Sequence, residues 1–182
     1  MKIKSPSSVR RVVELLQQAT IEIAAEYFRL PVTDMPLGSS RERVYCYELY
    51  SRLQSLWPDA LQRYSLAGEV DKASHPRITR TRAKNKKPDF IIHSPGNMDD
   101  NLAVIEVKRT TNLTEVQKDM ETLKFFKSDA GYQAGVLLLF GPSKAPWNLI
   151  RRAAEDEGVD LRDYIVLHHE VAGQAANRIE FA

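Results

Sequence analysis

Residues 87–108, "KPDFIIHSPGNMDDNLAVIEVK", place three charged side chains at the ends of apolar runs. Glu106 and Lys108 lie two residues apart at the end of "NLAVIEVK", and the period-two alternation of a strand puts both on one face. Asp89 opens the preceding run "DFIIH", and the Pro-Gly-Asn turn between the runs permits antiparallel pairing. This pairing predicts that Asp89 lies beside Glu106.

Two adjacent carboxylates repel each other, and a hard divalent cation such as Mg²⁺ is the usual compensation because it takes oxygen ligands. A lysine beside such a cation can hold an attacking water in line or neutralise charge that grows on a phosphate. The three residues therefore predict phosphodiester hydrolysis with Mg²⁺ as cofactor and Mn²⁺ as a substitute. The alternative is that Glu-x-Lys is a solvated ion pair at a strand end and that Pro-Asp is a turn dipeptide.

Periodicity and chain breakers predict the elements that position these residues. Apolar residues at helical spacing indicate a helix over 5–30, and a second helix begins at Ser39, where Ser39 and Glu42 form a capping box. Two further helices are expected at 114–126 and around 146–158. Short apolar runs between turn formers predict strands at about 63–72, 88–93, 101–108, 134–140, 163–169 and 177–181. The order of elements indicates an α/β fold with a mixed sheet flanked by helices.

The motifs "PDF" and "EVK", with sixteen residues between Asp89 and Glu106, resemble the signature of the PD-(D/E)XK nuclease superfamily. The resemblance implies an α/β/α sandwich with a central mixed sheet and a restriction-endonuclease-like core. It also implies that Asp89 and Glu106 are metal ligands, that the backbone carbonyl of Val107 is a further ligand, and that Lys108 is the catalytic lysine. It covers the core at 39–141, within a single domain over 1–182 that adds a helical extension at 1–38 and a helix and strands at 142–182.

Four other polar residues are candidates for the same site, of which Asp119 is a weaker one because solvation explains it. Glu48 lies among tyrosines on the second predicted helix, and many members of the superfamily carry a glutamate on the first core helix that reaches the metal. The alternative for Glu48 is an ion pair with Arg52 four residues on. Gln117 is a weaker candidate because helix capping explains it, and Glu69 is expected in the second shell of the site or at the border of its cleft.

The segment before Asp89 is strongly basic, since no acidic residue lies between Asp71 and Asp89. Such a segment attracts the phosphates of a nucleic acid, although a solvated loop is the alternative. No base-reading motif is evident, so no sequence specificity is predicted. The residues expected to contact nucleic acid are Lys72, Arg77, Arg80, Arg82, Lys84, Lys86 and Lys87.

Composition limits the function classes. The net charge of +2 is too small to identify a partner by itself, and the single cysteine, Cys46, excludes a disulfide framework. The chain begins without a secretory signal and contains no run long enough to span a bilayer, so a cytoplasmic protein without membrane contact is expected. The predicted function is a Mg²⁺-dependent nuclease, with DNA as the expected partner. A catalytically silent nucleic-acid-binding or partner-docking module of the same fold is the alternative, and a homodimer or a partner subunit that supplies specificity is left open.

Overall fold

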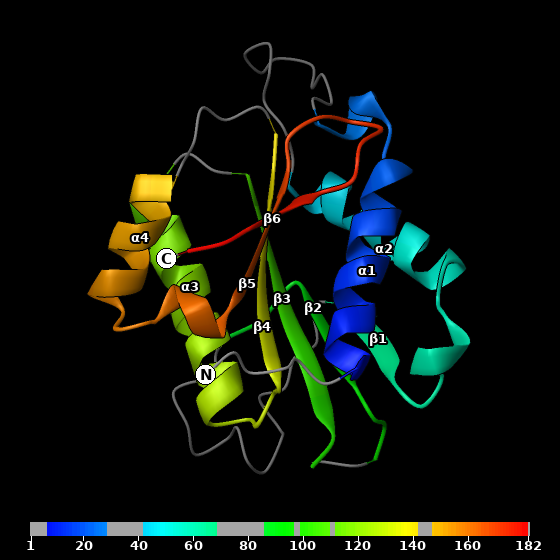
Figure 1. Cartoon of the computed structure of the whole chain (residues 1–182), viewed down its shortest axis with the longest axis horizontal. Coiled ribbons are helices and arrows are strands. Elements are labelled where there is room, and N and C mark those ends of the chain that lie inside the picture. The colour runs from blue at the N-terminus through cyan, green and yellow to red at the C-terminus, as the bar shows by residue number, and fades with distance from the viewer. Residues whose placement is uncertain are drawn as a thin grey trace.

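The structure is a computed structural model that describes residues 7–28, 42–68, 86–96, 99–109, 112–141 and 147–181. Within these residues, four α-helices and six strands follow in the order α1-α2-β1-β2-β3-α3-β4-α4-β5-β6 (Figure 1). The helices are α1 (Ser7–Ile21), α2 (Glu42–Ser55), α3 (Leu113–Ser128) and α4 (Trp147–Asp156). The strands are β1 (Ser65–Gly68), β2 (Phe90–His93), β3 (Asn101–Arg109), β4 (Ala134–Phe140), β5 (Ile165–His169) and β6 (Asn177–Ile179).

The strands form one mixed sheet in the order β1-β2-β3-β4-β5-β6. The first three strands are antiparallel, as the turn between β2 and β3 predicted. Strands β3, β4 and β5 are parallel because α3 and α4 carry the chain back between them, and β6 pairs antiparallel at the far edge. The expectation of an α/β fold with a mixed sheet flanked by helices is confirmed.

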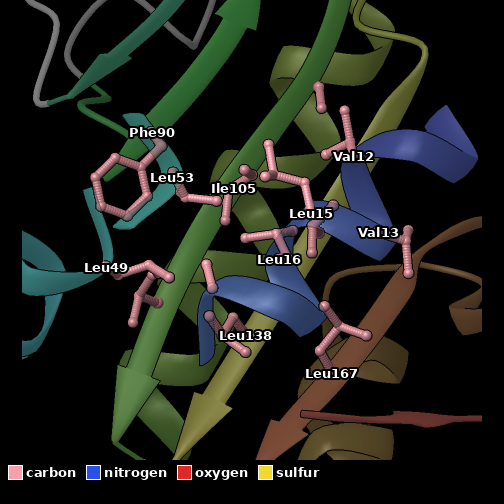
Figure 2. Packing of buried hydrophobic residues seen from close by; sticks show 14 of the residues in the cluster. Val12, Val13, Leu15, Leu16, Leu49, Leu53, Phe90, Ile105, Leu138 and Leu167 are labelled. Atoms are coloured by element: carbon pink, nitrogen blue, oxygen red, sulfur yellow. The ribbon is translucent and has the colours of Figure 1, made fainter. Parts of the chain in front are cut away.

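Helices cover both faces of the sheet, with α1 and α2 on one side and α3 and α4 on the other (Figure 1). On the first face, leucines of α1 and α2 pack on Ile105, Leu138 and Leu167 of the sheet (Figure 2). On the second face, Met120 and Leu123 of α3 pack on Val104 and other alternate residues of the strands. Strand β3 is buried from Asn101 through Val107, so its charged end emerges directly from the core.

The bounds of α1 and α3 differ from the predicted ones, the first beside a long-range contact and the second because of a local cap. The helix expected over 5–30 ends at Ile21, where Thr20 Oγ1 accepts a hydrogen bond of 2.9 Å from the backbone N–H of Ala176, and a short 3₁₀ turn follows at Ala25–Phe28. Helix α3 begins one residue before the predicted start, because the side chain of Asn112 accepts a hydrogen bond from Thr114 N–H and caps the helix. The predicted start at Ser39 lies outside the described residues.

Helix α2 is fixed to the sheet by the buried ring of Tyr45. This ring stacks on Phe140 of β4 with centroids 4.0 Å apart, and its hydroxyl lies 2.7 Å from Nδ1 of the buried His169. These contacts hold the first turns of α2 beside the carboxyl ends of β3 and β4.

The Tyr45 hydroxyl gives a stability prediction. We expect Tyr45→Phe to lower the free energy of unfolding by about 1 to 3 kcal/mol, because it leaves the buried His169 nitrogen without its hydrogen bond. Urea unfolding of the purified protein measures this change. Tyr47→Phe is the control, since Tyr47 is exposed on the same helix. Equal stability of the two variants would contradict the role given to Tyr45.

Candidate functional site

The register between β2 and β3 brings Asp89 beside Glu106. Phe90 pairs with Ile105, so Asp89, which lies just before β2, falls opposite Glu106 of β3. The backbone N–H of Val107 donates a 2.7 Å hydrogen bond to Oδ2 of Asp89, and the side chains of Asp89 and Glu106 are hydrogen-bonded to each other. The juxtaposition predicted from the two apolar runs is therefore present.

The two carboxyl groups are held where ionisation is unfavourable. Burial raises the pKa of Glu106 well above its usual range, and the nearby charges of Asp89 and Asp119 raise it further. Burial also raises the pKa of Asp89 to about 6, against the opposing effect of the Val107 N–H. Two neighbouring carboxyl groups of this kind resist losing both protons together, so the pair favours either a retained proton or a bound cation.

Lys108 lies among carboxylates from two helices, α2 and α3. Its Nζ lies 3.0 Å from Oε1 of Glu42, 3.5 Å from Oδ2 of Asp119 and 4.0 Å from Oε2 of Glu115. Burial lowers the pKa of Lys108, but Asp119 and Glu42 outweigh this effect and the pKa is raised overall. Lys108 is therefore a fixed cation and is unsuited to act as a general base at neutral pH.

Glu42 is a site residue that sequence reasoning assigned only to helix capping. From the start of α2, its Oε1 accepts a hydrogen bond from Lys108 Nζ, and its Oε2 accepts one of 3.3 Å from the backbone N–H of Arg109. The contact joins α2 to the end of β3 across 66 residues of sequence. The sequence signal for this contact was a glutamate in the first turn of a helix, which can either cap that helix or bind a group on another element.

Asp119 is the second residue that sequence reasoning undervalued. It projects from α3 with its side chain 13% exposed, and its buried Oδ2 lies 3.5 Å from Lys108 Nζ, an ion pair without a close hydrogen bond from the described residues. Burial raises its pKa to about 7, although Lys108 opposes the shift. A buried carboxylate oxygen without a close hydrogen bond is costly, and the ion pair with Lys108 offsets part of this cost.

Glu48 and Gln117 lie elsewhere. The carboxylate of Glu48 forms a 2.6 Å ion pair with Arg52, the alternative that the sequence left open, and Arg52 also contacts Glu22 of the short segment after α1. The side chain of Gln117 donates a 2.7 Å hydrogen bond to Asp156 and so bridges α3 to α4. The structure brings neither side chain to the Asp89 and Glu106 pair.

Most of the predicted basic segment lies outside the described residues, as does Glu69. Of its seven members, only Lys86 and Lys87 are described. Lys86 forms an ion pair with Glu121 of α3, and Lys87 is exposed just before Asp89. The prediction that the other five residues contact nucleic acid stays a prediction.

The donor chemistry at the strand ends fits a hard divalent cation. Asp89 and Glu106 supply adjacent carboxylates, whereas the carboxylate of Asp119 is engaged by Lys108 in a 3.5 Å ion pair. Within the described residues, no group of three or more His, Cys, Asp or Glu side chains is placed so that it could hold a metal ion. Asp89 and Glu106 are therefore the two side chains that would hold a cation here.

Comparisons of the chain with protein-family models, with curated proteins and with solved structures found no match. Among the described helices, none is long and apolar enough to cross a membrane. The assignment of the site therefore depends on its own geometry and chemistry.

The raised pKa of Asp89 predicts how stability depends on pH. Below about pH 4 the Asp89 carboxyl is protonated in both the folded and the unfolded protein. Between the unfolded pKa of about 3.9 and the higher folded pKa, Asp89 is protonated in the folded protein alone. The free energy of unfolding therefore falls as the pH rises toward 6, the folded-state pKa. In EDTA, Asp89→Asn is expected to be more stable than wild type by about 1 to 3 kcal/mol at about pH 8, with the difference vanishing near about pH 4.

Urea unfolding at both pH values measures this difference. Asp160→Asn is the control, because hydrogen bonds from Arg162 lower the pKa of Asp160 to about 2, whereas the pKa of Asp89 is raised. That variant should be no more stable than wild type at neutral pH. If Asp89→Asn destabilised the protein at every pH, the carboxyl pair would not be the unfavourable arrangement described above.

Proposed function

We propose that the chain is a metal-dependent phosphodiesterase that hydrolyses nucleic acid, with a restriction-endonuclease-like core of the PD-(D/E)XK type, and that DNA is its substrate. The observation that carries the proposal is the pairing of Asp89 with Glu106 at a buried strand end, with Lys108 on the same strand face. The element order supports it, since helix α2, antiparallel strands β1 to β3, helix α3 and strand β4 follow the order of that core.

The chain's own residues have distinct roles in this proposal. Asp89 and Glu106 hold Mg²⁺, and by the family resemblance the carbonyl of Val107 adds a ligand. When bound, such a cation makes water a better nucleophile and neutralises charge on a phosphate. Lys108 supplies a permanent positive charge and N–H donors beside the reacting phosphate, where negative charge grows in the transition state.

Glu42 and Asp119 position Lys108 in this proposal. They approach the ammonium from α2 and α3, on opposite faces of the sheet, and so fix the direction of its donors. A lysine side chain that is held in place loses less conformational entropy when the substrate binds. The two carboxylates also keep Lys108 charged in a largely buried position.

Cleavage assays test the proposed function. Linear and circular duplex DNA, single-stranded DNA and RNA are each incubated with Mg²⁺, Mn²⁺ or EDTA. We expect metal-dependent cleavage by the wild type and a loss of about 10²-fold or more in Asp89→Asn and Lys108→Ala. Lys118→Ala is the matched control, since Lys118 is an exposed lysine of α3, and it should cleave like the wild type.

Two results would contradict the proposal. Cleavage that survives in both Asp89→Asn and Lys108→Ala would place the activity elsewhere. Salt-dependent binding of nucleic acid without cleavage of any substrate would instead favour the catalytically silent binding module. Circular dichroism of each variant establishes that the loss of cleavage is not a loss of fold.

A further inference from the structure

A cavity of about 440 Å³ opens beside Asp89, on the side of α2 and the first two strands. Its volume lies in the range of about 300 to 1,000 Å³ that is typical of small-ligand pockets. The role proposed for Lys108 does not need this space. The residues that line it are Glu42, Arg43, Cys46, Tyr47, Tyr50, Gly68, Asp89 and Phe90.

Aromatic rings from two elements form much of this wall. Tyr50 of α2 stacks on Phe90 of β2, with ring centroids 6.2 Å apart and planes at 24°, so these two rings are held against each other. Tyr47 lies one helical turn before Tyr50 and presents its ring to the same cavity while remaining 64% exposed. A large exposed aromatic residue beside a cavity is typical of a surface that stacks on a flat ligand.

The polar lining of the cavity carries both signs of charge. Arg43 is an exposed cation on it, and Asp89 and Glu42 lie where the cavity meets the carboxyl pair and Lys108. A nucleotide likewise combines an aromatic part with a charged part, since a flat base is joined to an anionic phosphate. For a base within the cavity, the positive charge that can receive its phosphate at the Asp89 end is that of Lys108 and of the cation in the proposed function.

We propose that this cavity holds an unpaired nucleobase of single-stranded nucleic acid while the adjoining phosphate lies at Asp89, an inference that rests on the proposed nuclease function. A base within an intact duplex is stacked between its neighbours and cannot enter a side pocket without being flipped out. The chain therefore selects single strands or unpaired ends over continuous duplex. Stacking on Tyr47 accepts every base, since each base has an aromatic face.

Binding in EDTA tests the cavity separately from catalysis. The probes are a fluorescein-labelled oligothymidylate of about 12 nucleotides, the same strand with abasic sites, a duplex of equal length and thymidine monophosphate. Fluorescence anisotropy, with competition for the monophosphate, gives the dissociation constants. We expect the oligothymidylate to bind more tightly than the duplex, the abasic strand or the monophosphate.

Variants of Tyr47 identify the stacking contact. Tyr47→Ala is expected to weaken oligothymidylate binding about 5-fold to 100-fold, because stacking on one base contributes about 1 to 3 kcal/mol. Tyr47→Phe keeps the ring and should bind like the wild type. Ile21→Ala removes another exposed apolar side chain, one that does not line the cavity, and should also bind like the wild type.

The outcomes separate this inference from the proposed function. Unchanged binding by Tyr47→Ala, or equal binding of the abasic and intact strands, overturns the nucleobase pocket, while metal-dependent cleavage lost in Lys108→Ala would leave the nuclease proposal standing. Tighter binding of the monophosphate than of the strand also overturns it, in favour of a free-nucleotide site. Tyr47-dependent strand binding without metal-dependent cleavage supports the pocket and contradicts the nuclease.

Discussion

The antiparallel register of β2 and β3 forces two carboxyl groups together at a buried strand end. The sheet stabilises this arrangement through the hydrophobic layers on its two faces, while the pair itself resists ionisation because burial raises both pKa values. An unfavourable electrostatic arrangement persists when the surrounding fold is stable enough to impose it. In the proposed function, a bound cation relieves this unfavourable arrangement.

Lys108 balances only part of the negative charge of this region. Its ammonium contacts carboxylates from both α2 and α3, so the two helical layers meet at the end of β3. Asp119 nevertheless keeps a buried oxygen that has no close hydrogen bond from the described part of the chain. The fold therefore supplies more oxygen donors around Asp89 and Glu106 than one lysine can satisfy.

Sequence reasoning could find the residues whose placement depends on strand periodicity. Glu106 and Lys108 share a face because strands alternate, and Asp89 meets Glu106 because the short connection dictates antiparallel pairing. Glu42 and Asp119 could not be found in this way, since each reaches Lys108 only through the packing of a helix on the sheet. Glu48 failed to reach the site for the related reason that a local partner, Arg52, lies one helical turn away.

Calorimetric titration of Mg²⁺ into the protein tests most directly whether the paired carboxylates form a cation site. The matched variants are Glu106→Gln, which removes one carboxylate of the pair, and Glu155→Gln, which removes an exposed carboxylate of α4. The account predicts saturable binding by the wild type and Glu155→Gln, and its loss in Glu106→Gln. Binding of equal affinity in all three proteins, or the absence of binding in the wild type, would contradict it.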